Sequence, residues 1–501
     1  MTVDAHHEVA QRIQQLQAHD SQYRSATPDG TARAAARQPD LRLPQVLETM
    51  TRAYADRPAL GWRARTLTTD PATGRTTAQL QPRFDTISYR DLWDNVRAIA
   101  AAWRRDALNP VAPGDFVATV GFASPEYLTV DLVCAYLGLV AVPLQHNAPA
   151  SRLQPIIAEV EPRVLAAGAA YVDLAVEAAL GSTSVRRLVV FDYQPEVDDQ
   201  REALERARAK LSSAGMAIAV ETLGDVIDHG RALPAEPIFT GDTDQRLAMI
   251  LYTSGSTGLP KGAMYTERML TKLWTTELMP NYDDVSVFNV NFMPLNHLGG
   301  RLSLSSAFQA GGTSYFVPES DLSTLFEDWS LVRPTELGLV PRVAEMLHQR
   351  YQSAVDRLIS QGAEPQIAQM QAQAELRERV LGGRIVTSFC GTAPLAAEMK
   401  SFVETSLDVH VQDGYGLTEV GMVTKDGLIS RPPVIDYKLV DVPELGYFLT
   451  DKPYPRGELL VKSQTATPGY FKRPDVTANA FDPDGYYRTG DVMAELGADR
   501  L

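Results

Sequence analysis

The sequence predicts an α/β protein with two stacked, doubly wound α/β subdomains and a small β-barrel-like subdomain. Apolar strands alternate with helical patterns over residues 115–389, which is typical of parallel α/β layers. From about Tyr415, short strands separated by Pro and Gly replace the helices. The length of 501 residues also exceeds what one hydrophobic core usually organises, so several packed units are expected.

The first layer is clearest over residues 115–144. An apolar strand at 115–122 is followed by Ser124, a helix-capping residue, and by Pro125, which suits a first helical turn. The expected helix, 126–137, leads into a Val- and Leu-rich strand at 138–144, so the three elements predict a parallel crossover unit. Further strands of this layer are expected at 163–166 and 187–191.

The pattern restarts after a polar linker at 240–245, which predicts the second layer. Its expected strands are 247–253, 285–292, 313–317 and 384–389, with a helix over 267–278. We therefore expect four segments: a helical or irregular extension (1–44), a first α/β subdomain (45–240), a second α/β subdomain (241–411) and a β-rich subdomain (412–501).

Composition excludes several classes of protein. The chain has 62 acidic and 47 basic residues, a formal charge of −15, so its overall field repels nucleic acid and anionic membranes. No signal peptide and no run of apolar residues long enough to span a bilayer are visible, which favours a cytoplasmic protein. The two cysteines, Cys134 and Cys390, lie in apolar surroundings and are expected to be buried rather than disulfide-bonded.

The stretch from Tyr252 to Gly262 reads YTSGSTGLPKG and follows a predicted strand. Small residues let backbone N–H groups converge on phosphate oxygens, hydroxyls add donors, and a lysine adds positive charge. The nucleoside-triphosphatase signature is not met, because Pro260 stands where that motif needs glycine. We still predict a phosphate-binding loop, formed by Thr253, Ser254, Gly255, Ser256, Thr257, Gly258 and Lys261.

This stretch resembles the signature loop of the adenylate-forming superfamily, which includes acyl-CoA synthetases, luciferases and peptide-synthetase adenylation domains. The segment YGLTEVG at 415–421 resembles the second signature of that superfamily, and YRTGD at 487–491 resembles the third. Within it, MPLNHLGGR at 293–301 and GYYRTGDVMAE at 485–495 are most similar to the adenylation domain of bacterial carboxylic acid reductases.

The resemblance implies ATP- and Mg²⁺-dependent activation of a carboxylic acid to its acyl-AMP, with release of pyrophosphate. It implies that Thr418 contacts the α-phosphate, that Glu419 ligates Mg²⁺ and that Asp491 binds the ribose. A carboxylate suits a hard cation, which agrees with the role of Glu419. The adenine-binding residues that it implies are Gly391, Thr392 and Ala393 on one side and Asp413, Gly414, Tyr415 and Gly416 on the other.

By the same resemblance, His297 handles the substrate carboxylate, beside Thr392 and Gly416. The catalytic residues are then expected to be His297, Thr418, Glu419 and Lys261. Where the amino-acid-activating branch carries an aspartate for the α-amine, this chain reads FMPL from Phe292. A plain aromatic or aliphatic carboxylic acid is therefore the expected substrate.

The chain ends at Leu501, where relatives continue into a hinge and a small C-terminal subdomain with a catalytic lysine. We expect this lid subdomain, a phosphopantetheine carrier and an NADPH-dependent reductase domain to be missing. The chain should then bind ATP, AMP and acid but adenylate weakly, and its own carrier and reductase domains are the expected partners. Two alternatives stay open: the core of a stand-alone acyl-CoA synthetase, and a non-catalytic nucleotide-binding sensor of the same fold.

Overall fold

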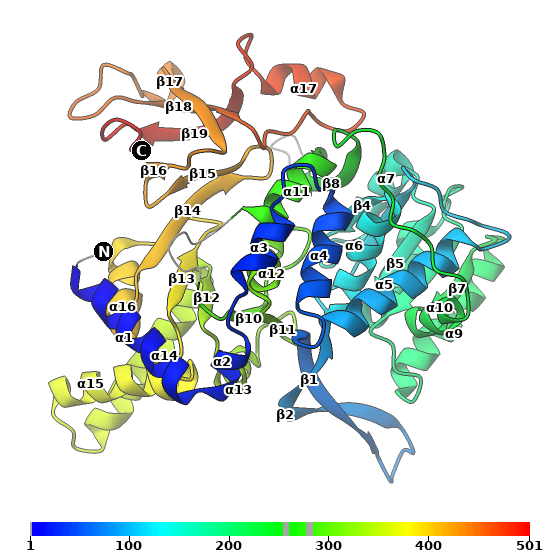
Figure 1. Cartoon of the computed structure of the whole chain (residues 1–501), viewed down its shortest axis with the longest axis horizontal. Helices are drawn as coiled ribbons and strands as arrows, with labels where there is room; N and C mark the ends of the chain where they lie inside the picture. Colours follow the sequence, from blue (N-terminus) through cyan, green and yellow to red (C-terminus); the bar gives the residue numbers. More distant parts are fainter. Residues whose placement is uncertain (1–2, 254–259, 277–283) are drawn as a thin grey trace. The chain divides into compact units, whose positions relative to one another are not determined.

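The computed structural model describes residues 3–253, 260–276 and 284–501, and it divides the chain into two compact units (Figure 1). We call Ala26–Leu331 the large unit, and Met1–Ser25 together with Val332–Leu501 the small unit. Within the described part of the chain, no helix is long and apolar enough to cross a bilayer.

A seven-stranded sheet organises the large unit, with the strand order β7-β6-β5-β3-β4-β8-β9. All neighbouring pairs are parallel except β8 and β9, which form an antiparallel hairpin. Its central strands are buried along their whole length, as expected for a parallel sheet covered on both faces. The strands are β3 (Phe116–Val120), β4 (Val140–Leu144), β5 (Val164–Gly168), β6 (Arg187–Phe191), β7 (Ala219–Thr222), β8 (Leu247–Thr253) and β9 (Lys261–Thr266).

The helices of this sheet cover both of its faces. The chain leaves β3 for β4 in one direction and then returns across β3 to β5, β6 and β7 in the other. Because such crossovers are right-handed, reversing the direction places the connecting helices on opposite faces. The helices are α5 (Tyr89–Arg104), α6 (Pro125–Leu137), α7 (Ala150–Val160), α8 (Val172–Ala179), α9 (Asp198–Ser213), α10 (Leu223–Arg231) and α11 (Glu267–Thr275).

A second sheet in the large unit has four strands in the order β10-β11-β1-β2. β1 and β2 form a long antiparallel hairpin, and β1 pairs in parallel with β11. Beneath it, Arg63 on β1 forms a buried ion pair with Asp328 at 2.6 Å. The elements are α3 (Gly30–Ala36), α4 (Leu43–Ala53), β1 (Pro58–Thr69), β2 (Thr76–Ser88), β10 (Phe288–Asn291), α12 (Leu298–Ala310), β11 (Thr313–Phe316) and α13 (Leu325–Val332).

The small unit contains a five-stranded sheet of order β12-β13-β14-β15-β16. Its first three strands are parallel and its last three antiparallel, so β14 belongs to both kinds of pairing. The elements are α1 (Val3–His19), α2 (Ser21–Ser25), β12 (Glu336–Leu339), α14 (Pro341–Ser360), α15 (Pro365–Glu375), β13 (Thr387–Cys390), α16 (Ala397–Leu407), β14 (Val411–Leu417), β15 (Gly421–Lys425) and β16 (Leu428–Ile429).

A three-stranded antiparallel sheet completes the small unit. It consists of β17 (Val434–Val440), β18 (Arg456–Ser463) and β19 (Tyr487–Ala494), with α17 (Pro474–Ala480) before the last strand. Apolar side chains of β15, β17, β18 and β19 form one core cluster that includes Val423, Leu459 and Tyr487. This is the β-rich end that the sequence predicts.

The fold confirms the α/β class, and it differs from the expected grouping of strands. We expected 247–253 to open the second layer, yet β8 pairs with β4 in the seven-stranded sheet. The strands expected at 285–292 and 313–317 pair with the β1–β2 hairpin instead. Both differences are long-range pairings, which strand periodicity does not encode. Cys134 and Cys390 are buried free thiols, as expected.

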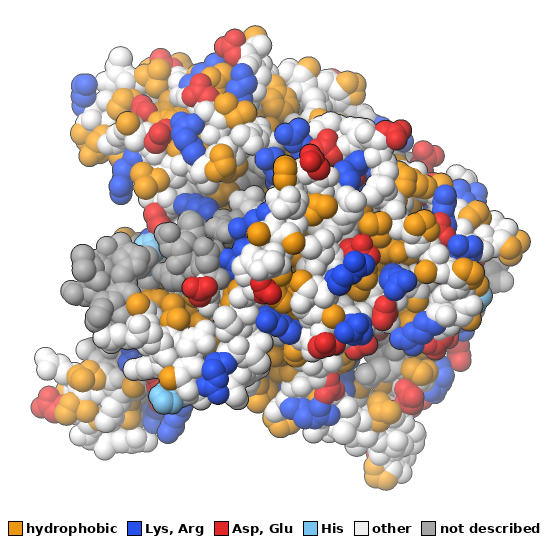
Figure 2. All heavy atoms as spheres, viewed as in Figure 1, with side chains coloured by type: hydrophobic (Ala, Val, Ile, Leu, Met, Phe, Trp, Pro, Cys, Tyr) orange, Lys and Arg blue, Asp and Glu red, His pale blue; other side chains and the backbone are white. Residues whose placement is uncertain are grey.

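Charged side chains of both signs occur together on the surface of the large unit. On the face of the large unit seen in Figure 2, acidic and basic side chains are interspersed. Several of them pair with each other, for example Arg75 with Glu202 at 2.9 Å and Arg90 with Asp56 at 2.7 Å.

Candidate functional site

The phosphate loop predicted after β8 is closed by an antiparallel hairpin. Ser254, Gly255, Ser256, Thr257 and Gly258 lie outside the described residues. On either side of them, β8 and β9 pair so that Thr253 faces Lys261. The hairpin therefore returns Lys261 to the carboxyl end of β8, beside the threonine with which it was grouped in the sequence.

The β8–β9 hairpin is anchored by tight packing below the loop. A side chain at Gly262 would place its Cβ 2.6 Å from Ile250, so only glycine fits this position without a shift. Tyr252 donates its hydroxyl hydrogen to Glu159 at 2.6 Å, which ties β8 to α7. The two strands that flank the predicted loop are thus held in place by this packing and this hydrogen bond.

His297 follows β10 at the N-cap position of α12, at the carboxyl end of its strand. Asn291, the last residue of β10, donates to the carbonyl of Gly300 at 2.9 Å, and Arg301 donates to the carbonyl of Leu295 at 2.7 Å. These bonds fix the turn that presents the imidazole. His297 as a whole residue is exposed, yet partial burial disfavours the charged form of its ring and lowers the pKa of His297.

A second histidine, His146, follows β4 in the same unit. Its ring contacts Phe122 and Tyr171 edge-on, with centroids 5.5 and 5.4 Å apart. Burial lowers the pKa of His146, and the charge of His297 lowers it further. Sequence reasoning missed His146 because a single histidine after a strand carries no motif.

In the small unit, the second and third signature segments meet. Tyr415 on β14 donates its hydroxyl hydrogen to the carboxylate of Asp491 on β19, at 2.7 Å. The backbone N–H of Asp491 donates to the hydroxyl of Thr489 at 3.0 Å, which orients the aspartate. Burial, and then this hydrogen bond, raises the pKa of Tyr415, so the phenol stays protonated. Two of the predicted nucleotide-binding residues are therefore in direct contact.

Glu419 is buried in the turn between β14 and β15, directly after Thr418, which is half-buried. Its carboxylate accepts a hydrogen bond from the hydroxyl of Tyr470 at 2.8 Å, and the hydroxyl of Tyr470 lies 3.0 Å from that of Tyr487. Burial raises the pKa of Tyr470, with the charge of Glu419 contributing. A buried carboxylate held by phenols is a pre-oriented oxygen ligand.

The donor set around Glu419 limits the kind of metal site that can form there. Among the described residues, no three His, Cys, Asp or Glu side chains gather as a metal cluster. A single carboxylate fits Mg²⁺, which keeps several waters and binds one or two carboxylates together with substrate phosphates. The same site does not fit Zn²⁺, which needs three or four protein ligands.

The segment Gly391, Thr392 and Ala393 follows β13 in the small unit. Thr392 has φ of +73°, a left-handed conformation that a β-branched residue rarely adopts. Such strain is stored mainly at functional sites, where the surrounding structure fixes it. Next to it, a Cβ at Gly391 would lie 2.9 Å from the ring of Phe389.

The predicted site residues are thus divided between the two units. Thr253, Lys261 and His297 belong to the large unit. The small unit carries the others that the structure describes: Gly391, Thr392, Ala393, Asp413, Gly414, Tyr415, Gly416, Thr418, Glu419 and Asp491.

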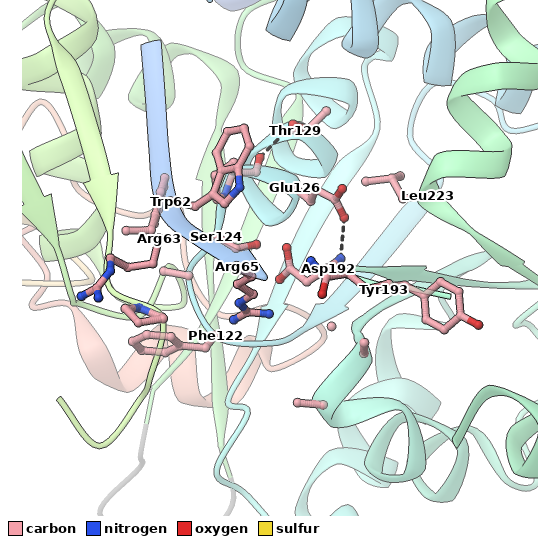
Figure 3. Close-up of a pocket in the computed structure, with 18 of the residues that line it drawn as sticks. Trp62, Arg63, Arg65, Phe122, Ser124, Glu126, Thr129, Asp192, Tyr193 and Leu223 are labelled. Carbon is pink, nitrogen blue, oxygen red and sulfur yellow. Dashed lines mark hydrogen bonds between the residues drawn. The ribbon is translucent and has the colours of Figure 1, made fainter. Parts of the chain in front are cut away.

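A cavity of about 550 Å³ opens in the large unit, at the carboxyl ends of β3, β5 and β6 (Figure 3). This is where the strand order reverses, the usual place for a ligand in an open α/β sheet. None of the described residues that the sequence predicted for the site lines it. It was missed because its wall comes from many separate segments of the chain.

Two acidic residues of this cavity, Glu126 and Asp192, interact with each other. The carboxylate of Glu126 accepts a hydrogen bond from the backbone N–H of Asp192, drawn as a dashed line in Figure 3. Burial, with the charge of Glu126, raises the pKa of Asp192 to about 7, whereas Ser124 and Arg65 act in the opposite direction. This hydrogen bond between the Asp192 backbone and the Glu126 carboxylate ties the N-terminus of α6 to the end of β6.

The family model described as AMP-binding enzyme matches residues 54–471 of the chain. The chain is 50% identical over 498 residues to a carboxylic acid reductase of Mycobacterium tuberculosis. This alignment covers 98% of the chain but only 42% of that relative, so the chain spans less than half of its length.

Two solved structures resemble the fold closely. One is the A domain of a carboxylic acid reductase from Segniliparus rugosus in complex with AMP and a co-purified carboxylic acid. It is 47% identical with a TM-score of 0.94, covering 98% of this chain and 78% of that one. The other is the adenylation domain of a carboxylate reductase from Mycobacterium chelonae, 45% identical with a TM-score of 0.96, covering 100% of this chain and 77% of that one.

Proposed function

Because this chain belongs to the AMP-binding enzyme family, as an adenylation domain of the carboxylic acid reductase type, we propose that it activates a carboxylic acid with ATP. A carboxylate oxygen attacks the α-phosphorus, the bond from that phosphorus to the bridging oxygen breaks, and pyrophosphate leaves. The products are the acyl-AMP and pyrophosphate, and no covalent enzyme intermediate is required. The observation that carries the proposal is the contact of Tyr415 with Asp491, which joins two signature segments.

The small unit would bind the nucleoside. Asp491, already accepting from Tyr415, has a second carboxylate oxygen that can accept from a ribose hydroxyl. Asp413, Gly414, Tyr415 and Gly416 would form one wall for adenine, with Gly391, Thr392 and Ala393 opposite. An aromatic ring and bare glycine backbone suit a flat base.

The phosphates would be held by the loop after β8 and by Thr418. Hydroxyls and backbone N–H groups of Thr253, Ser254, Gly255, Ser256, Thr257 and Gly258 would donate to the β- and γ-phosphates, and Lys261 would add a positive charge. Thr418 would donate to the α-phosphate. Positioning and charge neutralisation are the main requirements of this step.

Glu419 would hold Mg²⁺ together with phosphate oxygens of ATP. The bound ion would neutralise charge on the departing pyrophosphate. The support for this role is the buried carboxylate that Tyr470 orients at 2.8 Å. Glu419 would bind the ion only as a carboxylate, and Tyr470 stabilises that form by donating to it.

His297 would orient the substrate carboxylate from the large unit, and Thr392 and Gly416 are the residues of the small unit proposed to contact the acid. Its lowered pKa means that a neutral imidazole, which can donate one hydrogen bond, is present at pH 7. The FMPL sequence after β10 offers no carboxylate for an amine, which supports a plain acid, aromatic or aliphatic, over an amino acid.

We propose further that the complete protein passes the acyl group to a phosphopantetheine thiol on a carrier domain and reduces the thioester to the aldehyde with NADPH. The support is the match to carboxylic acid reductases, of which the chain covers 42%. A cytoplasmic location fits this reductive chemistry. A stand-alone acyl-CoA synthetase core is the less supported alternative, because the close relatives carry the reductase name.

Acid-dependent exchange of pyrophosphate into ATP, measured on the complete protein, tests the proposal. Benzoate or octanoate should each support exchange in the presence of Mg²⁺, and Glu419→Gln should lower the rate at least tenfold, about the loss of one electrostatic contact. Exchange that needs no acid would contradict acid activation. ATP binding without any exchange would instead support the nucleotide sensor, and acid-dependent use of free CoA without NADPH oxidation would support the synthetase.

A further inference from the structure

A cluster of charged side chains lies behind the proposed adenine wall, entirely within the small unit. The ring of His410 stands between two carboxylates: its Nδ1 lies 2.8 Å from Glu404 and its Nε2 lies 2.9 Å from Asp426. Lys400 also reaches Asp426, at 3.3 Å. None of these residues belongs to a signature segment.

The geometry defines the charge of the ring. A carboxylate is only an acceptor, so a ring with one at each nitrogen must donate from both, and only the imidazolium has two N–H groups. The hydrogen bond with Asp426 raises the pKa of His410 above its ordinary 6.5, against the opposing effect of burial, and Glu404 adds to it. Burial alone would raise the pKa of Asp426, but His410, the Asp413 amide and Lys400 together lower it to about 2.

Both carboxylates also hold the backbone of β14. Glu404 accepts from the N–H of Val411 at 3.0 Å, and Asp426 accepts from the N–H of Asp413 at 3.1 Å. The N–H of Asp426 donates in return to the carbonyl of Asp413 at 2.7 Å. The imidazolium thus links α16 to the turn after β15. Through the two carboxylates it holds the backbone of β14 at Val411 and at Asp413.

These backbone hydrogen bonds lie where β14 changes its pairing partner. Up to Asp413 the strand is parallel to β13, and from Gly414 onward it is antiparallel to β15. At Gly414 a Cβ would lie 2.5 Å from the ring of Phe389, so the backbone is packed against β13 at this point. The position of Tyr415, and with it its bond to Asp491, depends on how this crossing is held.

We propose that His410 is a positioning residue for nucleotide binding: as an imidazolium it fixes the Asp413–Tyr415 segment that receives the adenine. This rests on the proposed function of that segment. When the ring loses its proton, one nitrogen becomes an acceptor facing a carboxylate oxygen, and the hydrogen bond between them is lost. The adenine wall then loses its fixed position, although no group that touches the nucleotide has changed.

The direction of the pH effect follows from the raised pKa. Both hydrogen bonds from the ring are present while His410 is charged. One is lost as the pH rises through the folded-state pKa of His410, which lies above 6.5. The other groups that face the ring are Glu404, Asp426 and Lys400, and Asp413 lies beside them. Burial raises the pKa of the Asp413 carboxyl above its ordinary 3.8. Imidazole is the side chain type whose ordinary pKa lies near neutrality, so His410 is the group that changes charge in this pH range.

Calorimetric titration of this chain with AMP between pH 7 and pH 9 tests the proposal. The second ionisation of the AMP phosphate, near pH 6, is complete in this range. The wild-type affinity should fall about threefold to tenfold with rising pH, as for partial loss of one charged hydrogen bond. His410→Gln should bind weakly at every pH, and His410→Arg, which keeps two donors and its charge, should bind tightly at every pH.

Two further variants separate the possible outcomes. His19→Gln removes an exposed histidine of the same unit and should keep the wild-type profile. Asp426→Asn is the substitute test if His410→Gln does not fold. It keeps an acceptor, tolerates the left-handed backbone at φ +51°, and should flatten the dependence of AMP affinity on pH. Equal falls in affinity for wild type and His410→Gln would overturn the proposal. Failure of wild type to bind AMP at any pH would count against the proposed function instead.

Discussion

Thr392 shows how a single residue can mark a site through its backbone. Its φ of +73° costs about 1–3 kcal/mol for a residue that is not glycine. The residue is exposed and lies directly after β13, so burial of its side chain does not offset this cost. The strain is consistent with a threonine retained for contact with the bound acid or base.

Thr392→Gly should therefore stabilise the small unit while weakening ligand binding. Relief of strain exceeds the roughly 0.5–1 kcal/mol entropic cost of glycine, so a gain of about 0.5–2 kcal/mol in unfolding free energy is expected from denaturant titration. Thr450→Gly, at an exposed turn position without a left-handed φ, should lose stability by comparison. Equal losses for both variants would remove the argument from strain.

Asp192 gives a residue-scale prediction in the large unit. Its folded-state pKa of about 7 lies above the ordinary 3.8, so the folded protein favours the protonated carboxyl. The stability from this group is fully present below pH 4 and is lost as the pH rises through about 7. A shift of this size is worth at most about 4 kcal/mol, and less here because Glu126 titrates with it.

Asp192→Asn should consequently be more stable than wild type at pH 8, by about 1–3 kcal/mol, and similar to it at pH 4. Chemical denaturation at the two pH values measures the difference. Asp40→Asn, on an exposed residue of the same unit, should show no such pH dependence. A variant less stable than wild type at pH 8 would mean that Asp192 is stabilised as a carboxylate.

At the scale of elements, β14 connects the two kinds of pairing in the small unit and carries the second signature segment. A bulge separates Tyr415 from Gly416, and a Cβ at Gly416 would lie 2.5 Å from the carbonyl oxygen of Gly421 on β15. That neighbour is backbone and cannot rotate away. The hairpin that presents Tyr415 and Glu419 therefore requires glycine at this position.

Gly416→Ala should destabilise the small unit by about 1–3 kcal/mol, as for other overpacked sites, and should weaken AMP binding. Thermal unfolding and AMP titration at a temperature where the variant is folded measure the two effects. Gly497→Ala, at a glycine with open space around its Cβ, is the matched control and should be neutral. If Gly416→Ala matched that control, the hairpin would be less tightly packed than described.

Local elements were predictable from the sequence where local chemistry defines them. Ser124 caps α6 and Pro125 occupies its first turn, as expected, because capping depends on neighbouring residues. The pairing of β8 with β4 was not predictable, since strand periodicity says which face is buried but not which strand lies beside it. The β1–β2 hairpin was missed for a related reason: its exposed end lacks an apolar alternation.

The candidate site divides in the same way. The density of small and hydroxyl residues predicted the loop with Thr253 and Lys261, whereas the superfamily resemblance pointed to Tyr415 and Asp491, which the structure brings together. His146 and His410 were not found, because their significance lies in contacts with residues distant in the sequence. His410 in particular gains its charge from Asp426 across the turn after β15.

At the scale of the whole molecule, the chain carries the predicted phosphate loop and His297 on one unit and the predicted nucleoside-binding residues on the other. It spans 42% of the length of the carboxylic acid reductase that it matches. What this chain itself must do, on the proposed function, is bind the nucleotide and the acid.

Calorimetric titration of this chain with AMP, in the presence of benzoate, tests that claim most directly. We predict saturable binding of one AMP per chain with a dissociation constant below about 1 mM, weakened at least tenfold in Asp491→Asn, which loses a charged acceptor for the ribose. Absence of saturable heat with a chain that is demonstrably folded, or equal binding by Asp491→Asn, would contradict the account.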